Sequence, residues 1–247
     1  MLPHLYTELA SWWPLLSPPD AYQEDALVVH TLLQRALGHA PRSLLELGCG
    51  SGTLASHLPD GCARVLNDLS PEMLTVAQQR NPTAETVVGD LRSLRLDRTF
   101  DAVLIHDAVM YLSSEADLAA AIQTARAHLA VGGVLLMMPD FITETFYEGT
   151  DAGGSDAPDG RAIRLMEWRW DPDPDDASFQ VEMSLLLREQ DGTVRAVHER
   201  HTMSLFSHAT WWKHIRAAGL QPHDCTADLL GLELDSGVGE LFVARRT

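Results

Sequence analysis

The sequence has few cysteines, no long apolar run and too few basic side chains to balance its acids. Its 247 residues contain three cysteines, Cys49, Cys62 and Cys225. An odd, sparse set without CxxC spacing argues against a disulfide framework and a zinc site, and fits a reducing cytoplasm. No apolar run approaches the roughly 20 residues needed to cross a bilayer, and the N-terminus lacks the basic and apolar regions of a signal peptide. We therefore expect a cytoplasmic protein with neither a metal site nor a membrane anchor.

Acidic side chains outnumber basic ones by 35 to 18, which gives a formal net charge of −17. Affinity for nucleic acids comes largely from Lys and Arg, and the arginines here are scattered among acids. The charge therefore disfavours nucleic acid as a partner, and its simplest role is solubility. Apolar residues make up 45% of the chain, which suits one sizeable core with an insertion.

The N-terminal part predicts two helices. The first covers residues 5–13 and ends at Pro14. The second is capped by Asp20, runs to about residue 37 and stops at Gly38. We expect this part to form a helical lid.

Residues 39–147 alternate between predicted strands and helices. Strands are expected at 43–47, 63–66, 85–88, 100–105 and 134–138, the last after a turn at Gly132 and Gly133. Helices are expected at 53–58, from Pro71 with Ser70 as its cap, and up to Leu129 with Ser113 or Ser114 as its cap. This alternation implies parallel βαβ units in a doubly wound sheet.

The pattern changes after residue 147. Residues 148–160 are rich in Gly, Asp, Ser and Pro and predict a loop. Alternating segments follow at 162–170, 178–189 and 193–205, the last two joined by Gln190-Asp191-Gly192, a strong hairpin signal. A helix at 209–218, stopped by Gly219, and strands at 221–226 and 238–244 complete the main sheet. The expected fold is α/β: a Rossmann-like, doubly wound, mostly parallel seven-stranded sheet with an N-terminal helical lid and an inserted antiparallel β-sheet.

A glycine-rich loop, Glu46-Leu47-Gly48-Cys49-Gly50-Ser51-Gly52, follows the first of these strands. Alternate glycines let the backbone approach a ligand closely at a turn into a helix. Taken from Gly50, the pattern also matches the dinucleotide fingerprint, so an NAD-dependent oxidoreductase remains an alternative. Glu46 favours a different ligand, because a carboxylate is a poor neighbour for a pyrophosphate and suits a cationic amino group.

Three further polar stretches follow strand ends. Asp68 comes about twenty residues after the glycine loop, where an acid can accept from both ribose hydroxyls. Asp90, between Gly89 and Leu91, can accept from an adenine amino group. The stretch 106–111 would lie at the carboxyl edge of the sheet, where ligands bind in such folds. Glu46 and Asp90 could simply be solvated strand ends, and Asp68 a neighbour of a helix cap, although Ser70 caps better. It is the order and spacing of the motifs together that indicate a nucleoside site.

The stretches 44–52, 67–74 and 89–90 resemble class I S-adenosylmethionine (SAM)-dependent methyltransferases, over a match that runs from Ser43 to about Pro139. More loosely, the whole chain resembles the amino-sugar N,N-dimethyltransferases. That resemblance lies in the lid tyrosines Tyr6 and Tyr22 and in the segments 139–146, 201–206 and 241–244. It implies SAM as cofactor and a small-molecule acceptor, with N-methylation of an amine as the leading hypothesis. The alternatives are O-methylation of a hydroxyl or carboxylate, and a SAM-binding module without catalysis.

The resemblance also assigns residues and regions. Gly48 and Gly50 would line the methionine part, Asp68 the ribose, and Asp90 with Leu91 the adenine. The full set expected to contact the cofactor is Tyr22, Glu46, Gly48, Cys49, Gly50, Asp68, Leu69, Met73, Gly89, Asp90, Leu91 and His106. The chain would divide into a lid (1–38), a SAM-binding core (39–147), an antiparallel insertion (148–206) and a C-terminal part that completes the core (207–247).

The candidates for a general base are His106, Asp107, Tyr111, His201 and Tyr6. His106 and Asp107 rank first, because the edge of the fourth strand faces the methyl group in this fold. Many family members have His where this chain has Tyr111. The Asp/Asn-Pro-Pro-Tyr motif of enzymes that methylate DNA bases or protein glutamine is absent, which disfavours those substrates. Trp168 and Trp170 share one strand face and suit either the acceptor pocket or a homodimer interface on the insertion.

Overall fold

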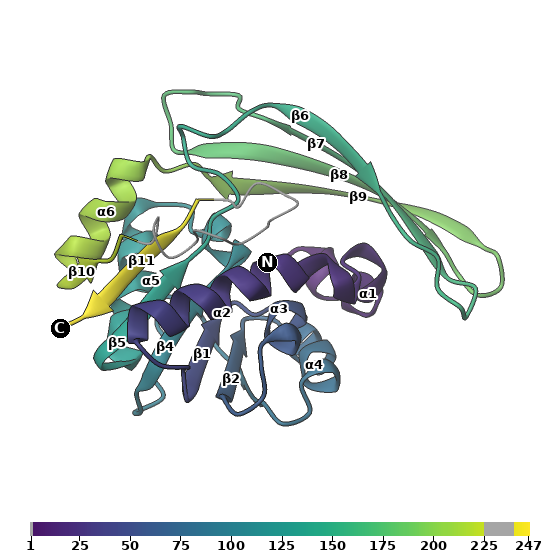
Figure 1. Cartoon of the computed structure of the whole chain (residues 1–247). Helices are drawn as coiled ribbons and strands as arrows, with labels where there is room; N and C mark the ends of the chain where they lie inside the picture. The colour runs from purple at the N-terminus through teal and green to yellow at the C-terminus, as the bar shows by residue number, and fades with distance from the viewer. Residues whose placement is uncertain (1, 225–239) are drawn as a thin grey trace.

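The computed structural model describes residues 2–224 and 240–247. Cys225 and the expected strand ends at 225–226 and 238–239 therefore lie outside the described residues. The described residues form two β-sheets and the helices packed against them (Figure 1). No helix in the described ranges is both long and apolar enough to cross a membrane.

The larger sheet confirms the predicted Rossmann-like class. Its order is β10-β11-β5-β4-β1-β2-β3, and only β11 runs antiparallel to the rest. Its strands are β1 (Ser43–Leu47), β2 (Ala63–Asp68), β3 (Glu85–Val88), β4 (Phe100–Ile105), β5 (Leu129–Met137), β10 (Leu220–Pro222) and β11 (Phe242–Arg246). The strand order reverses direction between β1 and β4, which is where open α/β sheets bind ligands.

Helices cover both faces of this sheet because its central strands are apolar on both sides. In β4, Ala102 and Leu104 join a core with α2 (Gln23–Leu37), while Val103 and Ile105 join the opposite core with α5 (Glu115–His128). Three further helices flank the sheet: α3 (Thr53–His57), α4 (Pro71–Arg80) and α6 (His208–Ala217). Alternate burial on the two faces fixes the register of the strands, and with it the positions of the side chains at their ends.

The side-chain caps resolve two of the predicted helix starts. Ser70 Oγ accepts from the amide of Met73 at 3.0 Å, as expected for α4. Ser114, and not Ser113, caps α5, accepting from the amide of Asp117 at 3.1 Å. Asp20 does not cap α2: it lies in the 3-10 turn η3 (Pro19–Tyr22), and the N-cap position is Tyr22.

The N-terminal segment is not the single helix expected over 5–13. It forms the short turns η1 (His4–Tyr6) and η2 (Ala10–Trp12), followed by α1 (Trp13–Leu16). Pro14 lies in the first turn of α1, where its missing amide costs nothing, instead of ending a helix. Packing sets this path, since Leu5, Leu9 and Trp12 are buried against the main core.

A second, four-stranded antiparallel sheet forms the insertion, in the order β6-β7-β8-β9. Its strands are β6 (Gly149–Gly153), β7 (Ala162–Trp170), β8 (Ser178–Arg188) and β9 (Val194–Ser204). The hairpin between β8 and β9 confirms the predicted turn, and its arms arch over α1 in Figure 1.

Two sequence expectations near these sheets are wrong. The predicted loop 148–160 contains β6, whose Gly- and Asp-rich sequence favours no strand and which is held by pairing with β7. The turn expected at Gly132 and Gly133 lies inside β5, where a register shift opposite Phe100 accommodates the glycines.

Candidate functional site

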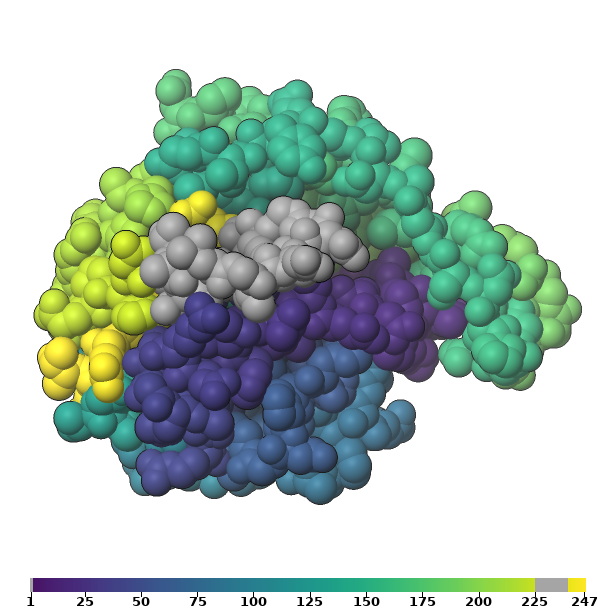
Figure 2. Space-filling view, viewed as in Figure 1, coloured from purple at the N-terminus to yellow at the C-terminus, as the bar shows by residue number. Residues whose placement is uncertain are grey.

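A cavity of about 940 Å³ opens at the carboxyl ends of β1, β2, β4 and β5. Its roof is the inner face of the four-stranded sheet, and the N-terminal segment closes one side. Figure 2 shows this segment, in purple, between the blue part of the larger sheet's layer and the teal strands of the insertion. Three parts of the chain that are far apart in sequence therefore share one cavity, as the position of the predicted motifs requires.

The glycine-rich loop forms the floor of this cavity, and neighbouring residues explain two of its glycines. A Cβ on Gly48 would lie 2.2 Å from the Cβ of Ala108, and one on Gly52 would lie 2.7 Å from Asn81 Nδ2. Both have positive φ, 73° and 65°. Gly50 is different, because a Cβ there would meet only Met73 Cε, at 3.6 Å. The loop thus needs glycine for its own packing and for its turn, while Gly50 leaves open space beside the cavity.

Glu46 is the most unusual polar group of the floor. It is 2% exposed, and its Oε2 has no hydrogen-bond partner among the described residues. Burial raises its pKa to about 7. A buried carboxylate without a partner is costly, and a cationic group placed in the cavity would relieve that cost. The sequence-based prediction that Glu46 faces a cationic ligand is compatible with this burial.

Asp68 is fixed in position by backbone donors. Its Oδ2 accepts from the amide of Gly50 at 2.8 Å, and its Oδ1 from the amide of Ser70 at 2.9 Å. Burial nevertheless raises its pKa. The Leu69 amide also donates to this carboxylate, so three of its roughly four lone-pair sites are used and it can accept a further hydroxyl donor from the cavity side.

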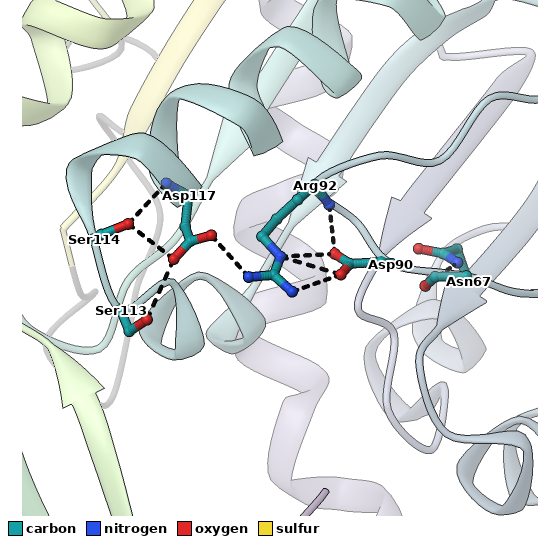
Figure 3. Close-up of polar contacts among 7 residues, drawn as sticks. Asn67, Asp90, Arg92, Ser113, Ser114 and Asp117 are labelled. Atoms are coloured by element: carbon teal, nitrogen blue, oxygen red, sulfur yellow. Dashed lines mark hydrogen bonds and ion pairs between the residues drawn. The ribbon is translucent and has the colours of Figure 1, made fainter. Parts of the chain in front are cut away.

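Asp90 is placed differently from the other two acids. It does not line the cavity, and both of its oxygens accept from Arg92, whose Nη1 also reaches Asp117 at 2.8 Å (Figure 3). Hydrogen bonds from Arg92 lower the pKa of Asp90. An adenine amino group would therefore compete with Arg92 for this carboxylate.

His106 and Asp107 form a charged cluster at the end of β4. His106 Nδ1 lies 3.1 Å from Asp107 Oδ1, and Tyr22 donates its hydroxyl to Asp107 Oδ2 at 3.1 Å. Burial opposes protonation of His106, but Asp107 outweighs it and the pKa rises to about 9. Burial and the Asp107 carboxylate raise the pKa of the neighbouring Asp140 well above its usual range. At neutral pH the cluster therefore holds an imidazolium beside the Asp107 carboxylate.

A chain of hydrogen bonds links the N-terminal segment to β9. The hydroxyls of Tyr6 and Tyr111 lie 2.6 Å apart, and Tyr111 Oη lies 2.7 Å from His201 Nδ1. His201 Nε2 lies 2.9 Å from Glu199 Oε2, while Glu199 Oε1 accepts from the amide of Leu5 at 2.8 Å. An ionised carboxylate only accepts, so Nε2 carries the ring proton and Nδ1 accepts from Tyr111.

The structure brings most of the predicted site residues together. Those that line the cavity are Tyr6, Tyr22, Glu46, Gly48, Cys49, Gly50, Asp68, Leu69, His106, Asp107 and Tyr111. Others lie behind this wall: Met73 is buried under Gly50, and His201 is buried behind Tyr111. Gly89, Asp90 and Leu91 are not among the lining residues.

Three residues of the site were missed by sequence reasoning. Asp140 follows β5, and its position directly after a buried strand was a usable signal. Glu199 is two residues from His201 on a strand, so the two share a face, which also could have been inferred. Arg169 carried no signal, because nothing in the sequence shows that the inner face of β7 turns toward the cavity.

Known proteins share both the sequence and the fold. A family described as "Methyltransferase domain" matches residues 44–133. The dTDP-3-amino-3,6-dideoxy-alpha-D-glucopyranose N,N-dimethyltransferase of Streptomyces fradiae is 30% identical over 203 residues, which cover 81% of this chain and 77% of that protein. The dTDP-3-amino-3,4,6-trideoxy-alpha-D-glucopyranose N,N-dimethyltransferase of Streptomyces venezuelae is 31% identical over 72% of this chain and 75% of its own length.

Solved structures agree with these matches. The crystal structure of Streptomyces venezuelae DesVI aligns with a TM-score of 0.81 at 27% identity and covers 100% of both chains. The SAM-bound structure of CalS10, an amino pentose methyltransferase from Micromonospora echinaspora, aligns with a TM-score of 0.71 at 28% identity, over 92% of each chain.

Proposed function

Because this chain belongs to the family of SAM-dependent methyltransferases that includes the amino-sugar N,N-dimethyltransferases, we propose that it methylates the amine nitrogen of a small molecule. Membership makes it a SAM-dependent methyltransferase of small molecules and sets aside the oxidoreductase hypothesis. The observation that carries the choice of an amine is the group of carboxylates on the cavity wall, which attract a cationic nitrogen.

We assign the floor of the cavity to SAM. The unpartnered Glu46 suits the ammonium group of its methionine part, and Gly50 leaves room for the backbone to approach it. Asp68 suits the ribose hydroxyls, since its carboxylate lines the cavity and its backbone donors hold it in place. Asp90 and Leu91 lie outside the cavity lining, beyond Asp68, and we assign them to the adenine, with Arg92 sharing the Asp90 carboxylate. Residues 1–38 would act as the lid, 39–147 and 207–247 as the core, and 148–206 as the roof.

SAM supplies an electrophilic methyl group, so the main tasks of the protein are to hold a neutral nitrogen near it and to remove a proton. His106 is already protonated at neutral pH, so it cannot take that proton. Asp107 and Asp140 would instead attract and orient the amine. Tyr6 and Tyr111 line the cavity and would pass the proton to His201 Nδ1. Glu199 then stabilises the imidazolium that forms.

The insertion also offers a surface for a homodimer. On the outer face of the four-stranded sheet, Met166 is 52% exposed and Trp168 51%, and Trp168 stacks on Trp170 with ring centroids 4.4 Å apart. Apolar side chains gathered on an exposed face are typical of protein interfaces. We also propose that the enzyme works in the cytoplasm, where the free thiols of Cys49 and Cys62 stay reduced.

The choice of nitrogen is tested with matched acceptors. The probes are dTDP-3-amino-3,6-dideoxyglucose, the phenyl α-glycoside of the same amino sugar, and a phenyl glycoside with a hydroxyl in place of the amine. We expect S-adenosylhomocysteine (SAH) release and N-methyl products, identified by NMR, from at least one amine and none from the hydroxyl control. Methylation of the hydroxyl control, or of neither amine by SAM-loaded enzyme, would contradict the proposal.

Binding of SAH should depend on pH through Glu46. Its pKa of about 7 means that the carboxylate is ionised above pH 7 and gains a proton below it. Because an ammonium group favours the ionised form, the affinity should fall about tenfold between pH 8 and pH 6. Calorimetry with the Glu46→Gln variant should show weaker binding and a flat pH dependence. Glu167→Gln, which removes a carboxylate from the roof, should keep the wild-type dependence, and a sloping Glu46→Gln profile would show the assignment to be wrong.

The role of His201 is tested through the pH profile of methyl transfer. In His201→Gln we expect kcat to fall about 100-fold, the usual scale for proton-transfer catalysis, while SAH affinity stays within threefold. The acidic limb of the kcat profile should vanish as well, which a merely structural defect would not cause. Tyr111→Phe should reproduce both effects, and His198→Gln, on the exposed face of the same strand, should behave as wild type. A normal acidic limb in Tyr111→Phe rules out this route.

Light scattering tests the dimer. Trp168→Glu should convert a dimer to a monomer, since a buried charge at an interface is strongly unfavourable. Leu27→Glu, at an apolar side chain of α2 that is 46% exposed, serves as the control and should leave the mass unchanged. A monomeric wild-type protein would refute the interface.

A further inference from the structure

The charges around the cavity differ from those of a phosphate-binding site. Seven of the described residues that line it are acidic: Asp25, Glu46, Asp68, Asp107, Asp140, Asp151 and Glu167. Two basic groups face them among the described lining residues, His106 and Arg169. Residues 225–239 cannot correct this imbalance, since their sequence contains no Lys or Arg.

Neither basic group is available to an anion. Arg169 is buried, and its Nη1 contacts the carboxylate of Asp151 and lies 3.6 Å from Glu167 Oε1. Its guanidinium also packs over the ring of Tyr147, 4.6 Å from the centroid. His106 is paired with Asp107. Both cations are therefore already neutralised by neighbouring carboxylates.

A diphosphate needs the opposite arrangement. Proteins usually bind the two negative charges of a diphosphate with unpaired arginine or lysine side chains or with helix N-termini. Here the raised pKa of Asp140 shows that the cavity already resists the negative charges it has. A bound diphosphate would add two more beside Asp107, Asp151 and Glu167, with no cation left to compensate them.

The roof of the cavity offers apolar contacts instead. Its lining side chains from the four-stranded sheet are Leu165, Phe179, Val181, Met183 and Met203. Phe141 extends this surface, since its ring centroid lies 5.9 Å from that of Phe179 in an edge-on arrangement. The cavity therefore has acidic side chains near its floor and apolar side chains on its roof. A complementary ligand has a cationic group attached to an apolar group.

We propose that the acceptor is an amine without phosphate, attached to an apolar aglycone or ring, and not a nucleoside-diphosphate sugar such as those in the names of the curated relatives. This inference rests on the proposed N-methyltransferase function and narrows its substrate class. Protonated, the amine is drawn to the carboxylates of Asp107 and Asp140, and the apolar body occupies the roof.

Binding to the SAH-loaded full-length protein tests the substrate class, with two amine probes that differ only in what the amino sugar carries. The probes are the phenyl α-glycoside of 3-amino-3,6-dideoxyglucose and dTDP-3-amino-3,6-dideoxyglucose. We expect the phenyl glycoside to bind at least tenfold more tightly, and free dTDP at millimolar concentration not to displace it. In the double variant Asp151→Asn/Glu167→Gln, which releases Arg169, the preference should shrink at least threefold.

Equal or tighter binding of the dTDP-sugar by the wild type would overturn the proposal. So would binding of neither probe, because the cavity would then not select amines of this kind. An unchanged preference in the double variant would show that the roof carboxylates do not exclude phosphate. Failure to bind SAH, or transfer to the hydroxyl control, would instead count against the proposed function itself.

Discussion

Uncompensated negative charge at the carboxyl edge of the larger sheet is the constraint on which the rest of the site depends. Glu46 is buried with an oxygen that no described residue satisfies, whereas Asp68 is held by two amides and Asp107 by an imidazolium and a phenol. Burying an unpaired carboxylate costs several kcal/mol, so folding alone would not favour it. A cationic ligand recovers that cost on binding, and the site is therefore selective for positive charge before any shape is considered.

The same constraint explains how the floor and the roof divide their tasks. The floor presents fixed acids on strand ends, where backbone geometry leaves them little freedom. The roof supplies apolar side chains together with an arginine already matched to Asp151. Among the described lining residues, the two basic groups are already paired with carboxylates, while several carboxylates face the cavity. Under the proposed function, charge more than size would separate acceptors in a volume of about 940 Å³.

Local signals explain which parts could be predicted from the sequence. The strand ending at Leu47, the cap at Ser70 and the hairpin at Gly192 each depend on a few neighbouring residues, and the structure has all three. The strand-end acids were predictable because the carboxyl ends of parallel strands meet at one edge. The path of residues 5–13 was not, since burial against the main core overrides its helical pattern. The hydrogen bonds from Arg92 to Asp90 were not predictable either, because this contact depends on the turn after β3.

A chain of hydrogen bonds joins the N-terminal segment to the antiparallel insertion. These are the two regions whose structure is hardest to predict from local sequence patterns. Tyr6 comes from the N-terminal segment, Tyr111 from the turn after β4, and His201 from β9. Glu199 connects β9 to the N-terminal segment, since one oxygen bonds His201 and the other accepts from the amide of Leu5. The segment that closes the cavity is therefore held by the same carboxylate that orients the imidazole. Closure of the cavity and the proposed proton route therefore depend on the same contacts, because displacement of the N-terminal segment would open the cavity and remove Tyr6, the phenolic partner of Tyr111.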